Sequence, residues 1–166
     1  KKIFNSEYLN IGSGIQPFNA WLLIRGLRTL PARLERITRT TQAIVDFLNS
    51  HDRVEKVIFP FSSDFPQYQL AMQQMSGGCG LLTFVIKAKD VTTIETFCNS
   101  LKHIFMAVSW GGHESLIIPK CSGMKREDFN PASQEHRQLR LYCGLEDAGY
   151  IIADLQQAFD AIERVE

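Results

Sequence analysis

The stretch that decides the fold is RQLRLYCGLED, which runs from Arg137 to Asp147. It predicts a strand over Arg137–Cys143. Since side chains alternate along a strand, one face carries Leu139, Leu141 and Cys143 and the other carries Arg140 and Tyr142. Glu146 and Asp147 then place acid at the start of a helix. That helix extends to about Arg164 on apolar residues at helical spacing, which are Ile151, Ile152, Leu155, Phe159 and Ile162.

Outward from this stretch, apolar runs predict strands at Val54–Pro60, Gly80–Lys87 and Phe105–Ser109, and a further extended piece at Leu116–Ile118. Helical spacing predicts helices over 18–28, 31–49, 66–75 and 90–101, after a connector over residues 1–16. The order indicates an α+β or α/β fold, a small sheet with helices packed on it. We expect one mixed or antiparallel sheet with helices 90–101 and 146–164 on the same face, contacting it through Ile94, Phe97, Leu155 and Phe159.

Composition fits a globular protein of one domain's length. The chain has 166 residues, 45% of them apolar, with 18 basic and 18 acidic side chains. This apolar fraction excludes wholesale disorder, and the balanced charge argues against nucleic acid or an anionic membrane as the main partner. No run approaches the ~20 apolar residues that span a bilayer, and no signal peptide opens the sequence. The four cysteines, Cys79, Cys98, Cys121 and Cys143, lack zinc spacing and are typical of reduced, mostly buried thiols in a cytosol.

Few residues form a pattern that indicates chemistry. The segment Ser109–Ser115 has two glycines, so it is either a tight turn or a loop that brings backbone N–H groups to an anion. Arg140 is an isolated cation in an apolar strand; it either reaches solvent or an acidic partner, or binds a carboxylate with its planar fork. The histidines are scattered, which argues against a metal site. Cys143 with His136 as base is a conceivable nucleophile, but the apolar face of Cys143 favours a buried thiol.

Three segments, in this order and spacing, resemble a known enzyme family: PFNAWLLIRGLRTL at Pro17–Leu30, SWGGHESL at Ser109–Leu116 and LRLYCGLED at Leu139–Asp147. They are similar to the C-terminal part of the pyridoxal-phosphate enzymes of cysteine and methionine metabolism. That family includes cystathionine β-lyase, cystathionine γ-synthase, methionine γ-lyase and the O-acetylhomoserine sulfhydrylases. The resemblance covers essentially the whole chain.

The resemblance implies fold type I, in which a large domain binds the cofactor through a lysine and a smaller, mostly antiparallel C-terminal domain closes over the substrate. It implies that residues 1–30 are a connector and helix of the cofactor domain and that residues 31–166 are the closing domain. The Ser/Thr-Lys-Tyr motif and the phosphate-binding turn of the family are absent from this sequence. We therefore expect no catalytic or cofactor-binding residue here, and no activity from this chain alone.

The resemblance also implies a substrate site. Arg140 matches the arginine that binds the substrate α-carboxylate, and Ser109 and Trp110 match the pair that lines it, through a hydroxyl and a backbone N–H. Tryptophan at this position is more like the cystathionine β-lyases. The implied reaction is β-elimination from an amino-acid thioether, which releases a thiol, pyruvate and ammonia. Cys143 and the loop 120–134 depart from the family pattern.

The implied whole protein is a cytoplasmic homotetramer that acts on a small amino-acid thioether, binds no metal, nucleic acid or membrane, and uses pyridoxal phosphate. Within the family, γ-synthase, γ-lyase and sulfhydrylase chemistry remain alternatives. Outside it, the lack of an acid–base constellation leaves open a small non-catalytic α+β module for binding or dimerisation.

Overall fold

The computed structural model describes residues 1–8, 14–78 and 80–164, and it divides the chain into two compact units, Lys1–Arg33 and Leu34–Glu166. The first unit holds a helical turn, η1 (Ile3–Tyr8), and helix α2 (Pro17–Leu27). Helix α3 (Leu30–Ser50) begins in the first unit and continues into the second. Helix α2 occupies the predicted range 18–28 to within one residue at each end, whereas the predicted connector contains a helical turn at η1.

The second unit is built on one five-stranded sheet with strand order β1-β2-β5-β4-β3. The strands are β1 (Val54–Ile58), β2 (Leu81–Ile86), β3 (Phe105–Met106), β4 (Leu116–Pro119) and β5 (Gln138–Tyr142). Three neighbouring pairs are antiparallel and only β3 and β4 run parallel. The prediction of one mostly antiparallel sheet is therefore confirmed.

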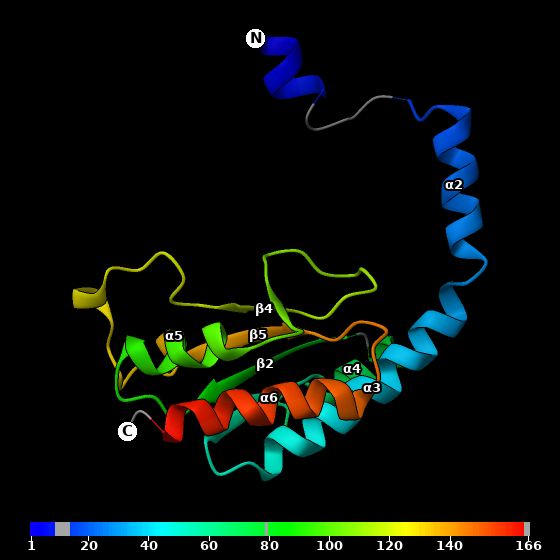
Figure 1. Cartoon of the computed structure of the whole chain (residues 1–166). Coiled ribbons are helices and arrows are strands. Elements are labelled where there is room, and N and C mark those ends of the chain that lie inside the picture. Colours follow the sequence, from blue (N-terminus) through cyan, green and yellow to red (C-terminus); the bar gives the residue numbers. More distant parts are fainter. Residues whose placement is uncertain (9–13, 79, 165–166) are drawn as a thin grey trace. The chain divides into compact units, whose positions relative to one another are not determined.

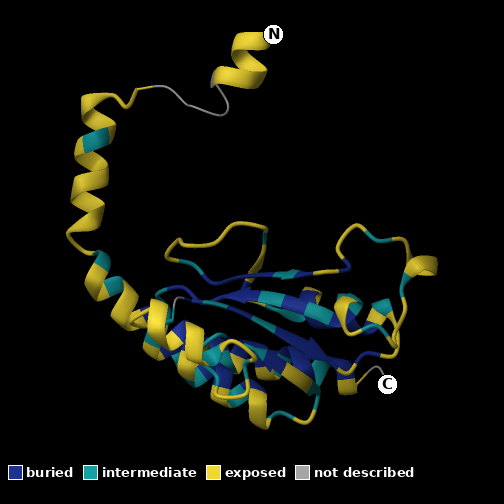
Figure 2. Cartoon of the chain, turned by 180° about the vertical axis from the view of Figure 1, so that it is seen from behind, coloured by how far each residue is buried: buried dark blue, intermediate teal, exposed yellow. Residues whose placement is uncertain are grey.

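Helices α3, α5 (Val91–Ser100) and α6 (Ala148–Glu163) pack on one face of this sheet (Figure 1). Their apolar residues join the inward residues of the strands in a single core cluster, and Figure 2 shows the buried strands at its centre. The four residues predicted to make this contact are all at most 1% exposed, namely Ile94, Phe97, Leu155 and Phe159. The predicted packing of the two helices on the same face is confirmed.

Helix ends follow the side chains that cap them. Asp90 accepts a hydrogen bond from the Thr93 N–H, and Asp147 accepts one from the Gly149 N–H, so each carboxylate satisfies a free donor at a helix start. The predicted helix 66–75 is observed as the shorter α4 (Tyr68–Gln74).

The β3–β4 edge of the sheet differs most from the strands that the sequence predicts. Strand β3 ends at Met106 instead of Ser109, and the extended piece at 116–118 is a full member of the sheet, paired with β5 as β4. The loops before and after β4 rise on the side of the sheet opposite α6 (Figures 1 and 2). The second of them contains two short 3-10 turns, η2 (Arg126–Asp128) and η3 (Glu135–Arg137).

Candidate functional site

A pocket of ≈ 540 Å³ lies on the face of the sheet that these three helices leave uncovered. Its lining comes from β2, β4, β5 and the two loops around β4, through Thr83, Val108, Ile118, Pro119, Lys120, Ser122, Gln138 and Arg140. The register explains this set, because Arg140 on β5 stands opposite Thr83 on β2 and Ile118 on β4. The alternation that buries Leu139 and Leu141 in the core turns Arg140 toward the pocket.

Arg140 is held in place but left with free hydrogen-bonding capacity. Its Nη2 donates to the backbone oxygens of Val108, at 2.6 Å, and Ser109, at 3.3 Å. Its Nε atom is buried and has no hydrogen-bond partner. Within the described part of the chain no carboxylate pairs with it, which disfavours the alternative of a strand arginine neutralised by a nearby acid. A guanidinium fixed by two carbonyls and short of acceptors is suited to bind an anion with two oxygens.

The loop between β3 and β4 is tied to β5 and to the turn that follows it. The Tyr142 hydroxyl donates to the Gly112 oxygen at 3.0 Å, and the Leu145 N–H donates to the His113 oxygen at 2.7 Å. The loop backbone lies so near Gly144 that a Cβ there would stand 2.3 Å from the His113 oxygen. Only glycine at this position permits the approach.

Glu146 fixes the far end of the same loop. Its carboxylate accepts two hydrogen bonds from Ser115, from the N–H at 2.7 Å and from the hydroxyl at 2.9 Å. The Ser115 oxygen in turn accepts the Gly144 N–H at 2.9 Å. Because Ser115 is 1% exposed, these bonds replace water that the buried groups have lost. The loop that carries Ser109 and the strand that carries Arg140 are thus held in one arrangement.

Ser109 contacts Arg140, but neither Ser109 nor Trp110 is among the described residues that line the pocket. The backbone oxygen of Ser109 accepts a hydrogen bond from the Arg140 guanidinium, and Ser109 is an exposed residue. Trp110 is 61% exposed. The hydroxyl and N–H roles that the resemblance implies for this pair stay predictions. Gly111 has φ of 88°, which a glycine adopts without strain, so the turn interpretation of the two glycines holds at this residue.

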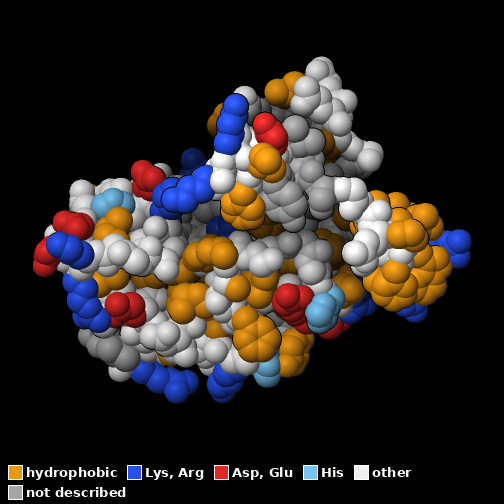
Figure 3. All heavy atoms as spheres, turned by 90° about the horizontal axis from the view of Figure 1, so that it is seen from above, with side chains coloured by type: hydrophobic (Ala, Val, Ile, Leu, Met, Phe, Trp, Pro, Cys, Tyr) orange, Lys and Arg blue, Asp and Glu red, His pale blue; other side chains and the backbone are white. Residues whose placement is uncertain are grey.

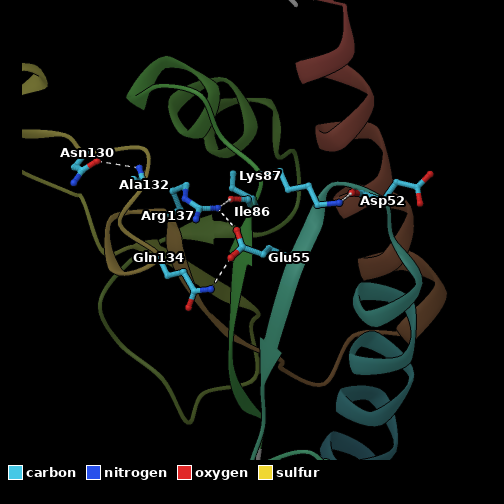
Figure 4. Close-up of polar contacts among 8 residues, drawn as sticks. All are labelled: Asp52, Glu55, Ile86, Lys87, Asn130, Ala132, Gln134 and Arg137. Atoms are coloured by element: carbon cyan, nitrogen blue, oxygen red, sulfur yellow. Dashed lines mark hydrogen bonds and ion pairs between the residues drawn. The ribbon is translucent and has the colours of Figure 1, made fainter.

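A second polar cluster anchors the loop after β4 (Figure 4). Arg137 forms an ion pair with Glu55 on β1 and donates to the Ile86 oxygen at 3.1 Å, and Gln134 donates to Glu55 at 2.5 Å. The hydrogen bond from Arg137, and then that from Gln134, lowers the pKa of the Glu55 carboxyl below its usual 4.5. This cluster holds the end of the loop that borders the pocket.

The described cysteines are buried free thiols, as the sequence predicts, and Cys79 lies outside the described residues. Burial raises the pKa of Cys143 to about 12 and that of Cys98 to about 12. A protonated, buried thiol is a poor nucleophile. His136 accepts a hydrogen bond from the Asn130 N–H at 3.0 Å, and its ring lies tilted against that of Phe129, so these contacts are with the loop. The burial of Cys143 and the loop contacts of His136 disfavour a thiol nucleophile at Cys143.

Sequence reasoning missed much of the pocket lining. Thr83, Gln138 and Lys120 share the pocket with Arg140, and the sequence pattern indicates none of them as a site residue. The signal exists in principle, because residues two apart on a strand share a face, which puts Gln138 beside Arg140. Placing Thr83 and Lys120 there requires the strand register, which the sequence pattern does not supply.

Residues 2–160 match the sequence profile of the family described as Cys/Met metabolism PLP-dependent enzyme. The chain belongs to this family. Among curated relatives, it is 38% identical to canavanine γ-lyase of Pseudomonas canavaninivorans, over 96% of this chain and 40% of the relative. It is 38% identical to L-methionine γ-lyase of Treponema denticola, over 91% of this chain and 38% of that enzyme. The chain thus spans about two fifths of the length of the curated relatives it matches.

Solved structures of the family agree. The chain matches cystathionine γ-synthase of Xanthomonas oryzae, in complex with aminoacrylate and cysteine, with a TM-score of 0.80 and 31% identity, over 94% of this chain and 41% of that one. It matches an O-acetylhomoserine (thiol)-lyase of Campylobacter jejuni that carries a pyridoxyl-lysine phosphate, with a TM-score of 0.75 and 28% identity, over 96% and 39%. The family resemblance and its fold are confirmed. The predicted similarity to the β-lyases is not confirmed, since these relatives are γ-lyases, a γ-synthase and a thiol-lyase.

Membership of a family of pyridoxal-phosphate enzymes favours an enzyme fragment over a free-standing binding module. Over the ranges that the structure describes, no three His, Cys, Asp or Glu side chains are grouped to hold a metal ion. In the same ranges no helix is long and apolar enough to cross a bilayer. Figure 3 shows basic and acidic side chains interspersed on the face seen from above, consistent with the balanced charge of the sequence.

Proposed function

We propose that this chain is the part of a pyridoxal-phosphate-dependent carbon–sulfur lyase that binds the α-carboxylate of the substrate. The observation that carries this proposal is the buried, unpartnered Nε of Arg140 at the edge of the pocket. A buried donor without an acceptor costs about 1–3 kcal/mol, and a bound carboxylate removes that cost. The cofactor-dependent family of the chain supports an amino-acid substrate as the source of that carboxylate.

The residues of this chain fit the substrate and not the cofactor. The sequence lacks the lysine motif and the phosphate-binding turn that hold pyridoxal phosphate in the family, so we assign the cofactor site to the rest of the whole protein. When bound, pyridoxal phosphate acts as the electron sink for the substrate carbanion. Arg140 would fix the carboxylate and with it the orientation of the Cα–H bond, and the carbonyls of Val108 and Ser109 would keep the guanidinium from turning away.

Two reactions remain as candidates within this function. The relatives that carry γ-lyase names support γ-elimination. Trp110 supports β-elimination, because tryptophan at this position resembles the cystathionine β-lyases. Since the backbone oxygen of the neighbouring Ser109 accepts a hydrogen bond from Arg140, β-elimination stays the second candidate.

The products separate the two reactions. The whole protein, loaded with pyridoxal phosphate, would be given cystathionine, the thioether bound in another solved structure of the Xanthomonas oryzae γ-synthase. Both reactions consume one water: γ-elimination yields cysteine, 2-oxobutyrate and ammonia, whereas β-elimination yields homocysteine, pyruvate and ammonia. Either set supports a carbon–sulfur lyase. Absence of any 2-oxo acid from cystathionine, methionine and cysteine thioethers alike would contradict the proposal.

We assign residues 1–30 to the cofactor domain. None of the residues of α2 is buried, and Phe18, Leu23 and Leu27 are each at least 59% exposed. A helix that is apolar on all sides is typical of the interior of a larger protein. The remaining three fifths of the relatives' length could supply this cover. A homotetramer and a cytoplasmic location stay predictions for the whole protein.

A further inference from the structure

Lys120 shares the pocket with Arg140, and the strand register explains why. The Lys120 N–H donates to the Gln138 oxygen at 2.8 Å, which continues the β4–β5 pairing by one residue. Lys120 is two residues after Ile118, which stands opposite Arg140, so both cations lie on the same face of the sheet as diagonal neighbours. Diagonal neighbours have Cα atoms about 7–8 Å apart, within reach of long side chains.

Two cations line the pocket, and the one acidic partner that the structure records for them is exposed. Among the described residues its lining contains the two cations and no acidic residue, and Thr83, Ser122 and Gln138 add hydroxyl and amide groups. Lys120 lies 3.5 Å from Glu135, but both side chains of this pair are more than half exposed, at 58% and 65%. Exposed ion pairs of this kind contribute little, so the ammonium can exchange Glu135 for a bound anion. Like charges on one face repel, and an anion between or beside them relieves the repulsion.

We propose that the pocket selects substrates with two carboxylates. Arg140 binds the α-carboxylate, and Lys120 binds a second carboxylate at the far end of the substrate side chain. This inference rests on the proposed function for the role of Arg140. Pockets of about 300–1,000 Å³ hold small molecules, and the ≈ 540 Å³ here leaves room for a thioether that joins the two charged ends. An ammonium is a point charge and binds a carboxylate without fixing its orientation. This suits the distal carboxylate, which does not have to be aligned for the reaction as the α-carboxylate does.

Paired substrates test this in the whole protein. The S-(2-carboxyethyl) and S-propyl thioethers, of cysteine or of homocysteine according to which the enzyme cleaves, differ only in the distal charge. We expect Lys120→Gln to raise KM about tenfold for the carboxyethyl thioether and to leave KM for the propyl thioether within about twofold, with kcat unchanged for both. Lys125→Gln is the matched control, because Lys125 is on the same loop, pairs with exposed Glu127 and does not line the pocket.

An equal rise of KM for both thioethers would overturn the proposal and assign Lys120 to the α-carboxylate site. No change for either would remove Lys120 from binding altogether. If the whole protein cleaves neither thioether, the proposed function is still tested by cystathionine and methionine, and ligand binding to the present chain tests the selection of two carboxylates. In that measurement adipate should shift the NMR amide signals of Lys120 and Gln138, hexanoate should not, and Lys120→Gln should abolish the adipate shifts. Equal shifts with both acids would overturn the selection of two carboxylates.

Discussion

Asp154 on α6 is a buried carboxylate with a structural task. It is 2% exposed and accepts the N–H groups of Lys102, His103 and Ile104 at 2.9–3.0 Å, which fixes the turn after α5. In Asp154→Asn an NH2 group, itself a donor, would replace one of the two oxygens that accept these N–H groups, so at least one of the hydrogen bonds would be lost. We expect the free energy of unfolding to fall by about 2–3 kcal/mol, measured by urea denaturation. Asp160→Asn on the same helix, where the carboxylate accepts an exposed hydrogen bond from the Gln156 side chain four residues away, should change it by less than about 0.5 kcal/mol.

Glu55 links stability to pH. Its hydrogen bond from Arg137 lowers the pKa of the folded carboxyl below 4.5, so the folded state binds this proton less readily than the unfolded chain does. The resulting stability is present above the unfolded pKa and is lost as the pH falls through the lower folded pKa. Urea denaturation between about pH 5 and pH 3 should therefore show a shallower loss of stability in Glu55→Gln than in the unmodified chain. If the free energy of unfolding depended on pH in the same way in both proteins, the contact with Arg137 would not lower the pKa of Glu55.

At the scale of elements, the sequence predicted what depends on local pattern. Strand β5 and helix α6 were found because alternation, an acidic cap and helical spacing coincide between Arg137 and Arg164. The prediction makes strand β3 three residues too long. The Ala107 N–H still donates to the Ile117 oxygen, but the oxygens of Val108 and Ser109 accept hydrogen bonds from Arg140 instead of continuing the strand. Register depends on contacts between distant segments, so the position of Lys120 beside Gln138 could not be predicted.

The loop between β3 and β4 owes its position to Glu146. In Glu146→Gln one of the two acceptors for Ser115 becomes a donor, so the clamp on the Ser115 N–H and hydroxyl loses one bond. We expect hydrogen exchange at the Ser115 amide to speed up by about tenfold or more, while exchange at Leu139 and Leu141 in the core stays unchanged. Glu163→Gln, at the end of the same α6, is the control and should leave the loop amides as they are. Faster exchange throughout β5 would show instead that Glu146 stabilises the whole sheet.

At the scale of the molecule, the division of labour within the whole protein has a direct consequence for this chain. The lysine motif of the family is absent, so the chain should form no covalent adduct with pyridoxal phosphate at a specific site. Borohydride reduction of the chain with the cofactor, followed by mass spectrometry of its peptides, should show no lysine modified in stoichiometric yield. The whole protein treated in the same way should show one modified lysine outside this chain. A stoichiometric adduct at any lysine between residues 1 and 166 would contradict the assignment of the cofactor to the rest of the protein.

The central claim is that Arg140 binds and aligns the substrate carboxylate, and steady-state kinetics of Arg140→Leu in the whole protein test it most directly. Loss of a bidentate, charge-assisted contact should lower kcat/KM by about two orders of magnitude or more, with kcat falling as well because the reacting bond is no longer held in orientation. Arg140→Lys should recover only part of this activity, since an ammonium lacks the planar fork. The absorbance of the bound cofactor should stay as in the unmodified protein. Near-normal kinetics in Arg140→Leu would contradict the claim and leave Arg140 as a structural residue of β5.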